Sequence, residues 1–174
     1  MVEVTRTFLE MRDPAELNRK PLPTPDARIV RRSPCTAEQY RELYHRVGEQ
    51  WHWRDRDVWS DERLAQQLAK PNVFVWELRV GERLGGYFEL EAQDDGAVEI
   101  VYFGLTTEFI GLGFGAAMLS RAADEAFALG ASRVWLHTCT IDSPHALPNY
   151  KARGFRETGQ VERYVLQMSD VPSP

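Results

Sequence analysis

The sequence has few cysteines, no excess of basic residues and no long apolar run. Its two cysteines, Cys35 and Cys139, lie far apart and show no metal-ligand spacing, so we expect reduced thiols and no metal site. The net charge of −5 argues against a broad nucleic-acid-binding surface. No run approaches the roughly 20 apolar residues of a membrane span, and the first residues lack the pattern of a secretory signal. We therefore expect a cytoplasmic protein that binds neither nucleic acid nor membrane.

The 174 residues, 43% of them hydrophobic, suffice for one domain with a substantial core. Residues 2–10 alternate enough to predict a strand, and the Pro-rich residues 21–25 predict an extended connector. We interpret residues 1–26 as an N-terminal extension, residues 27–168 as the core of the domain and residues 169–174 as a tail.

Periodicity predicts the order of elements in this core. We expect strands over 27–31, 73–80, 84–92, 97–105, 132–138 and 161–168, and helices after Thr36, after Ser60, over 116–129 and after a cap at Ser143. Tight turns join the strands from 73 to 105 in an antiparallel meander, in which the pair Gly85 and Gly86 suggests a bulge or a close approach of the backbone. The long helix makes strands 97–105 and 132–138 parallel. Pro148 should kink the last helix or delay its start. The pattern predicts a mixed α/β sheet.

The pattern of residues 99–119 predicts a strand, a glycine-rich turn and a helix. This order of elements is typical of an anion-binding site. A helix start leaves backbone N–H groups unpaired, and glycines let a phosphate approach them. A P-loop is excluded because no Lys-Ser/Thr pair enters the helix. Gly111, Gly113 and Ala116 formally satisfy a dinucleotide fingerprint, but no acidic residue ends the next strand.

Two motifs indicate a third type of phosphate-binding loop. Gly113 and Gly115 fit the Gln/Arg-x-x-Gly-x-Gly/Ala signature, with Ile110 in place of Gln/Arg. Residues 143–155 resemble an Asn-x-x-Ala-x-x-x-Tyr-x-x-x-Gly-Phe segment, with Ser143 in place of Asn. On these motifs residues 97–155 resemble the acyl-CoA-binding core of the GCN5-related N-acetyltransferase (GNAT) superfamily. The resemblance implies the GNAT acyl-CoA N-acyltransferase fold, an antiparallel meander followed by a βαβ cofactor core, with residues 27–168 as the catalytic core.

The resemblance also implies acetyl-CoA, or coenzyme A, as the cofactor. Backbone groups of the strand ending at 105 would pair with the pantetheine arm and polarise the thioester carbonyl. The loop would hold the diphosphate, Ser143 and Tyr150 would lie along the arm, and Arg153 could meet the 3′-phosphate, although a solvated helix face explains Arg153 as well. The cofactor-binding residues expected are Phe103, Gly104, Leu105, Ile110, Gly111, Leu112, Gly113, Phe114, Gly115, Ala116, Ser143, Tyr150 and Arg153.

Two residues are candidates for catalysis. An amine with a lysine-like pKa must lose a proton before it attacks a thioester, which costs about 4.6 kcal/mol at pH 7. Glu99 falls where histone-acetylating family members carry a general base, although it also fits an outward-facing strand residue. Tyr150 matches the family tyrosine near the sulfur and could protonate the leaving thiolate, or could be a core tyrosine.

The acceptor pocket is assigned to Trp51, His52, Trp53, Glu99 and His137. The segment at 51–53 has three interpretations: core aromatics, a pocket wall or a dimer contact. His137 and Cys139 flank Thr138, but with no orienting acid a packed histidine and a reduced thiol explain them better than a nucleophile.

The sequence thus predicts an N-acetyltransferase that moves acetyl from acetyl-CoA directly to a primary amine. The acceptor, whether a small molecule or a peptide amine, and the oligomeric state, a homodimer included, stay open. A non-catalytic acyl-CoA-binding module is the first alternative, supported by the departures at Ile110 and Ser143, and a NAD(P)-binding oxidoreductase is the second.

Overall fold

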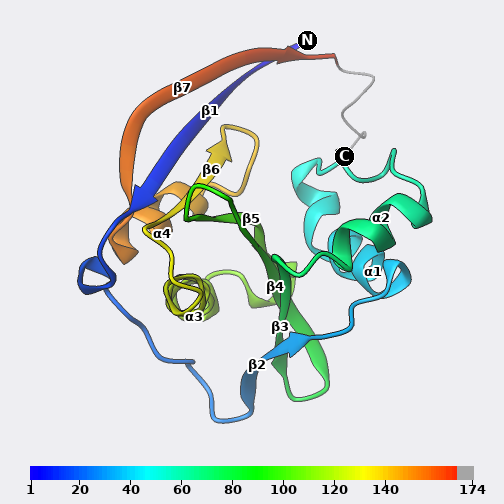
Figure 1. Ribbon diagram of the computed structural model, residues 1–174, viewed down its shortest axis with the longest axis horizontal. Helices are drawn as coiled ribbons and strands as arrows, with labels where there is room; N and C mark the ends of the chain where they lie inside the picture. The colour runs from blue at the N-terminus through cyan, green and yellow to red at the C-terminus, as the bar shows by residue number, and fades with distance from the viewer. Residues whose placement is uncertain (168–174) are drawn as a thin grey trace.

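The computed structural model describes residues 1–167, and its main feature is a mixed seven-stranded sheet with helices on both faces (Figure 1). The strands are β1 (Val2–Met11), β2 (Ala27–Arg32), β3 (Val73–Val80), β4 (Arg83–Ala92), β5 (Ala97–Leu105), β6 (Arg133–Cys139) and β7 (Arg156–Leu166). The α-helices are α1 (Ala37–Gly48), α2 (Asp61–Leu68), α3 (Phe114–Ala128) and α4 (Ala146–Arg153). The order in the sheet is β2-β3-β4-β5-β6-β1-β7, which confirms the predicted α/β class.

Strands β2 to β5 pair antiparallel and confirm the predicted meander. Leu78 pairs with Gly86 and Arg79 with Leu84, so Gly85 is the extra residue of a bulge at the predicted position. A Cβ on Gly86 would lie 2.4 Å from the carbonyl oxygen of Gly104, so the backbones of β4 and β5 can approach here only without a side chain.

Strands β5 and β6 are parallel, as the connecting helix predicted, but they stay together only at one end. The paired residues are Ala97 to Glu99 of β5 and Arg133 to Trp135 of β6, and the described chain forms no further pair between the two strands. Beyond this point β5 follows β4 and β6 follows β1, so β5 and β6 diverge toward their carboxyl ends. A bulge at Val101 bends β5 where the two strands separate.

The predicted strand near the N-terminus is confirmed as β1, but its place in the sheet was not predicted. β1 lies between β6 and β7 and is antiparallel to both. Strand β7 begins at Arg156, five residues before the predicted Val161, because it pairs with β1 along most of its length. The predicted strand end at Met168 and the tail at 169–174 lie outside the described residues.

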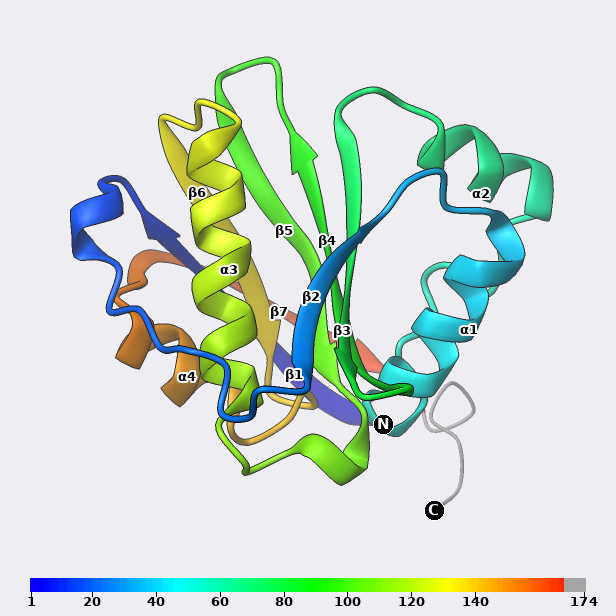
Figure 2. The same cartoon turned by 90° about the horizontal axis from the view of Figure 1, so that it is seen from below.

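Two apolar cores form. The helices that cover them, α3 and α1, lie on opposite faces of the sheet (Figure 2). On one face α3 buries Met118, Leu119 and Ala122 against β4, β5 and β6. On the other face α1 buries Tyr40 and Tyr44. α1 begins after Thr36, as predicted, in a capping box in which the Thr36 and Gln39 side chains accept from each other's backbone N–H groups. None of the helices in the described part of the chain has the length and apolar character that a membrane crossing requires.

Helix α4 begins later than predicted. Its N-cap is His145, whose side chain makes no capping bond, so the predicted cap at Ser143 with Pro144 as first helical residue was wrong. Ser143 instead accepts from the N–H of His145 within the turn before the helix. Pro148 falls in the first turn, where its missing N–H costs nothing, and this confirms the predicted delay. Helix α3 begins at Phe114 rather than Ala116 and ends one residue earlier than predicted, at Ala128.

Candidate active site

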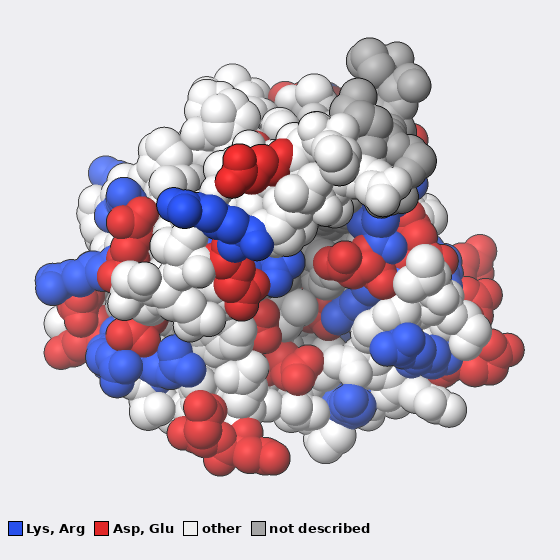
Figure 3. All heavy atoms as spheres, turned by 90° about the horizontal axis from the view of Figure 1, so that it is seen from above, with Lys and Arg blue, Asp and Glu red and all other residues white. Residues whose placement is uncertain are grey.

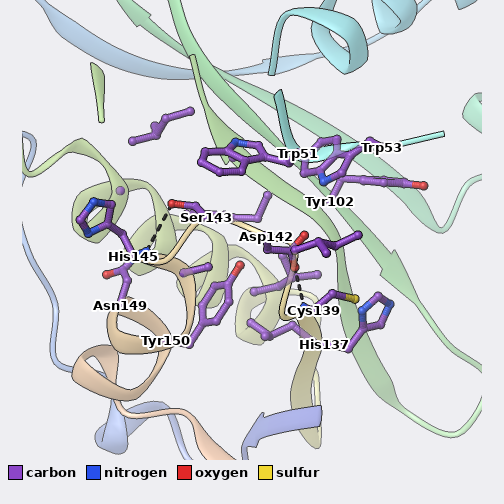
Figure 4. A pocket seen from close by; sticks show the side chains of 18 of the residues that line it. Trp51, Trp53, Tyr102, His137, Cys139, Asp142, Ser143, His145, Asn149 and Tyr150 are labelled. Carbon is purple, nitrogen blue, oxygen red and sulfur yellow. Dashed lines mark hydrogen bonds between the residues drawn. The ribbon is translucent and has the colours of Figure 1, made fainter. Parts of the chain in front are cut away.

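A cavity of about 430 Å³ lies where β5 and β6 diverge. It reaches from the loop before α3 to the segment after α1 and to the far strands β1 and β7. Figure 3 shows one face of the molecule with a hollow at its centre and both acidic and basic side chains around it. Figure 4 shows the cavity from close by, with Trp51, Trp53 and Tyr102 along one side and the turn of Ser143 and His145 on the other.

The loop before α3 presents unpaired backbone donors to this cavity. Ile110 N–H bonds to the Thr107 carbonyl, but in the described chain no backbone bond is made by the N–H groups of residues 111–116. Gly111 and Gly113 have φ of +80° and +90°, a conformation that favours glycine and turns successive N–H groups toward one side. The N-terminus of the 15-residue α3 adds its positive dipole end. This arrangement can bind an anion such as a diphosphate.

Gly115 shows that the protein leaves space at this point. A Cβ there would meet Leu105 Cδ1 at 3.5 Å and Asn149 Nδ2 at 3.6 Å, which are ordinary contact distances. The packing of the protein does not require glycine here, and Gly115 lines the cavity. The missing side chain therefore leaves room for something that approaches the helix N-terminus closely.

Most of the predicted cofactor-binding residues do line the cavity. They are Phe103, Gly104, Leu105, Ile110, Gly111, Gly113, Gly115, Ala116, Ser143 and Tyr150. The prediction for Arg153 needs correction, because Arg153 does not line the cavity. Leu112 and Phe114 are not lining residues either, but their backbone N–H groups belong to the unpaired set at residues 111–116, so both stay predicted as main-chain donors. The Leu112 side chain is 58% exposed and turned to solvent, whereas Phe114 is buried against Phe109. Arg153 is buried at the end of α4, so the alternative interpretation, that it belongs to a solvated helix face, was also wrong.

Glu99 lies near the cavity but does not line it, contrary to its assignment to the acceptor pocket. It sits at the last pair between β5 and β6, opposite Trp135, before the strands separate. Its carboxylate accepts from Gln93 Nε2 at 3.3 Å. Burial, together with the negative charges of Glu91 and Glu89, raises its pKa to about 7. A carboxyl group with this pKa exchanges protons readily near neutral pH.

Tyr150 is buried on α4 between Phe103 and Phe155. Its hydroxyl group points into the cavity beside Ser143 and Asp142 (Figure 4). Burial raises the pKa of Tyr150 well above its usual value, and Asp142 and Cys139 add to this shift. The phenol is therefore a proton donor at neutral pH. The ring is part of the core, as one interpretation predicted, and the hydroxyl group faces the cavity. The role of Tyr150 as proton donor to a thiolate stays a prediction.

His137 and Cys139 line the cavity from β6. Burial lowers the pKa of His137 to about 4, with Arg6 as a second cause, so its imidazole is neutral at pH 7. Its buried Nδ1 has no hydrogen-bond partner among the described residues. Cys139 Sγ lies 3.6 Å from the Tyr164 hydroxyl group rather than beside an activating base. Asp142 accepts from Thr138 Oγ1 and Cys139 N, which fixes the turn after β6.

Trp51, His52 and Trp53 all line the cavity, as the pocket-wall interpretation predicts. His52 has a φ of +59° and turns the chain between the two indoles. The Trp53 ring also packs into the aromatic cluster of α1, 5.0 Å from the Tyr102 ring centroid and against Gly48. The core and pocket interpretations are therefore both correct for Trp53. The dimer interpretation stays untested.

A buried ion pair anchors this wall to the sheet. Arg56 donates to both carboxylate oxygens of Glu89, at 2.8 and 3.0 Å, and both side chains are at most 5% exposed. Its guanidinium group also lies about 5 Å from the rings of Tyr40, Trp59 and Tyr102. Burial lowers the pKa of Arg56, but the facing Tyr40 and Glu89 raise it by more, so the group stays charged. We call this set of five residues the Arg56 anchor.

Several cavity residues escaped the sequence analysis. Arg6 and Tyr164 reach the cavity only because β1 and β7 lie beside β6, and no local pattern reveals that pairing. Tyr102 reaches it because the bulge at Val101 changes which residues of β5 share a face. The run of charged residues after Trp53 was the available signal for Asp55, which follows the pocket wall directly.

A sheet that opens between two parallel strands, next to a helix N-terminus with unpaired N–H groups, can accommodate an extended ligand that carries an anionic group. Residues 38–155 match the acetyltransferase (GNAT) family, so the chain belongs to that family. A comparison with curated protein sequences found no match.

Solved structures support the same fold. A GCN5-related N-acetyltransferase from Kribbella flavida superposes with a TM-score of 0.66 at 16% identity, over 91% of this chain and 56% of that protein. An aminoglycoside acetyltransferase from an uncultured soil metagenomic sample, in complex with sisomicin, gives 0.61 at 14% identity, over 74% and 87% of the two chains. A Bacillus subtilis acetyltransferase in complex with CoA gives 0.57 at 23% identity, over 75% and 76%. The chain thus spans little more than half the length of the Kribbella protein.

Proposed function

We propose that the chain is an N-acetyltransferase that moves acetyl from acetyl-CoA directly to a primary amine. The observation that carries this proposal is the set of unpaired N–H groups at residues 111–116 beside the gap between β5 and β6. The family match and the CoA bound to the B. subtilis relative support the cofactor. When bound, acetyl-CoA supplies an acyl thioester.

The residues of this chain have separate tasks in the proposal. The loop at 111–116 holds the diphosphate through main-chain donors and the α3 dipole. The free edge of β5 at Phe103 and Leu105 binds the pantetheine arm and points fixed dipoles at the thioester carbonyl. Tyr150 holds a proton beside Ser143, where a thiolate leaving group would need it.

Glu99 is the proposed base. Its carboxylate lies behind the cavity surface, so it takes the amine proton through water, and only its deprotonated form can do so. The rate, kcat/KM, should therefore rise with pH around an inflection near 7, the pKa of Glu99. Glu99→Gln should abolish this inflection and lower kcat/KM at neutral pH by roughly 100-fold.

Glu91→Gln is the matched control for Glu99. The Glu91 carboxylate is bonded to Gln67 and raises the pKa of Glu99 through its charge. Its removal should shift the inflection to lower pH and leave the maximal rate intact. If Glu99→Gln retains the inflection and the neutral-pH rate, Glu99 is not the base.

Tyr150→Phe should lower kcat by roughly 100-fold, because the leaving thiolate loses its proton donor. CoA affinity and thermal stability should change little, since the described residues offer the hydroxyl group no hydrogen-bond partner and the ring is retained. Stopped-flow thiol detection measures kcat, titration calorimetry measures CoA affinity, and scanning calorimetry measures thermal stability. An unchanged kcat would assign Tyr150 to the core alone.

The two alternatives predict different outcomes in simple assays. Thiol release from acetyl-CoA in the presence of an amine panel tests the enzyme, and cofactor binding without turnover on any amine would favour a binding module. A thermal-shift comparison tests the oxidoreductase: acetyl-CoA should stabilise the protein and NADPH should not. Stabilisation by NADPH alone would overturn the proposed function.

A further inference from the structure

We propose that the acceptor is a compact amine with one ammonium group on an aromatic body. This inference rests on the proposed function and concerns the end of the cavity lined by Trp51, Trp53 and Tyr102. These three residues come from two separate elements and form the wall that faces the turn of Ser143 (Figure 4).

The wall is aromatic and firmly held. The Trp53 ring is packed against Tyr102, with centroids 5.0 Å apart, and fits a space that only glycine leaves at position 48. Three residues further on, Arg56 ties the segment to Glu89 of β4. A rigid aromatic surface binds a flat ring with little loss of conformational freedom, and it also attracts a cation.

Of the charged residues that line the cavity, all but one carboxylate have a partner among the described residues. Arg6 is paired with Glu162 and Arg54 with Asp57, while the Asp142 carboxylate accepts two hydrogen bonds from the turn after β6. Asp55 is the remaining charged residue of the lining, and it has no ion-pair or hydrogen-bond partner among residues 1–167. Asp55 lines the same cavity as Trp53 and Tyr102.

The neutral His137 and the size of the cavity restrict the chemical class of the acceptor further. Because its pKa is about 4, His137 adds no positive charge that would repel an ammonium group at pH 7. The cavity of about 430 Å³ must also hold the end of the cofactor arm, which leaves room for a small acceptor. A polyamine or an aminoglycoside carries several ammonium groups, and one free carboxylate cannot match them.

The experiment measures thiol release from acetyl-CoA with 2-phenylethylamine, n-butylamine, spermidine, sisomicin and a lysine-containing peptide. We expect kcat/KM for 2-phenylethylamine to exceed that of each other amine by at least about tenfold. A higher value for spermidine, sisomicin or the peptide overturns this inference and leaves the proposed function standing. Calorimetric binding of CoA without turnover on any amine overturns both.

Two variants test the assignment of residues. Asp55→Asn should raise KM for 2-phenylethylamine about tenfold, and Trp51→Leu should do the same while keeping an apolar side chain. CoA affinity should not change in either variant, which also shows that they fold. Glu49→Gln is the matched control, an exposed carboxylate on the same segment that does not line the cavity. An Asp55→Asn variant with the KM of the Glu49→Gln control would contradict the inference.

Discussion

Replacing Gly115 with glutamate is expected to lower the affinity for CoA by roughly 100-fold or more. The new carboxylate would occupy the space that Gly115 leaves at the helix N-terminus and would itself accept bonds from the unpaired N–H groups. Two lost charge-assisted hydrogen bonds are worth about 3 to 6 kcal/mol, and each 1.4 kcal/mol is about a tenfold change in affinity. Isothermal titration calorimetry measures the loss directly.

The fold itself should tolerate this change. A glutamate in the first turn of a helix interacts favourably with the dipole, so the free energy of unfolding should stay the same or rise by up to about 1 kcal/mol. Leu112→Glu is the matched control, because it adds the same charge to the same loop on a side chain that is 58% exposed. CoA binding should survive in that control. Equal losses of CoA affinity in the two variants would mean that the added charge acts at long range rather than in the site.

Replacing Arg56 with methionine should destabilise the protein by about 3 to 5 kcal/mol. The substitution leaves the Glu89 carboxylate buried with only the Tyr40 hydroxyl as a bonded partner. For a chain of this size, the melting temperature should fall by roughly 6 to 20 °C. Adding Glu89→Gln should recover part of the loss, because the double variant no longer buries an unpaired charge.

The control is an exposed pair of the same type. Arg19 bonds to both carboxylate oxygens of Asp124, but the two side chains are 52% and 41% exposed. Arg19→Met should cost about 1 kcal/mol or less, because water screens the pair. If denaturant unfolding shows that Arg56→Met lowers the free energy of unfolding no more than Arg19→Met does, the Arg56 anchor does not hold the segment of the pocket wall.

Local patterns predicted the elements whose causes are local. The capping box at Thr36 set the start of α1, the paired glycines at 85 and 86 placed a bulge, and the helix after residue 113 made β5 and β6 parallel. Each depends on residues within a few positions of one another, so the sequence contains the physical cause. The GNAT resemblance added the succession of a meander and a βαβ unit, and the expectation of a cofactor loop.

The errors come from long-range contacts. Nothing near β1 indicates that it inserts between β6 and β7, and Arg6 enters the site only through that pairing. Glu99 matches a family position, yet β5 and β6 are still paired there, and this keeps its side chain out of the cavity lining. Arg153 is on the last turn of a charged helix, but tertiary packing buries it. The Arg56 anchor joins three elements and was also not predicted.

The account depends on main-chain donors at residues 111–116 holding a diphosphate. Calorimetry with CoA and with pantetheine, which lacks the diphosphate but keeps the arm and thiol, tests this most directly. We expect CoA to bind and pantetheine to bind at least roughly 100-fold more weakly, since two charge-assisted bonds contribute about 3 kcal/mol or more. No heat with CoA, or equal affinity for the two compounds, would contradict the account.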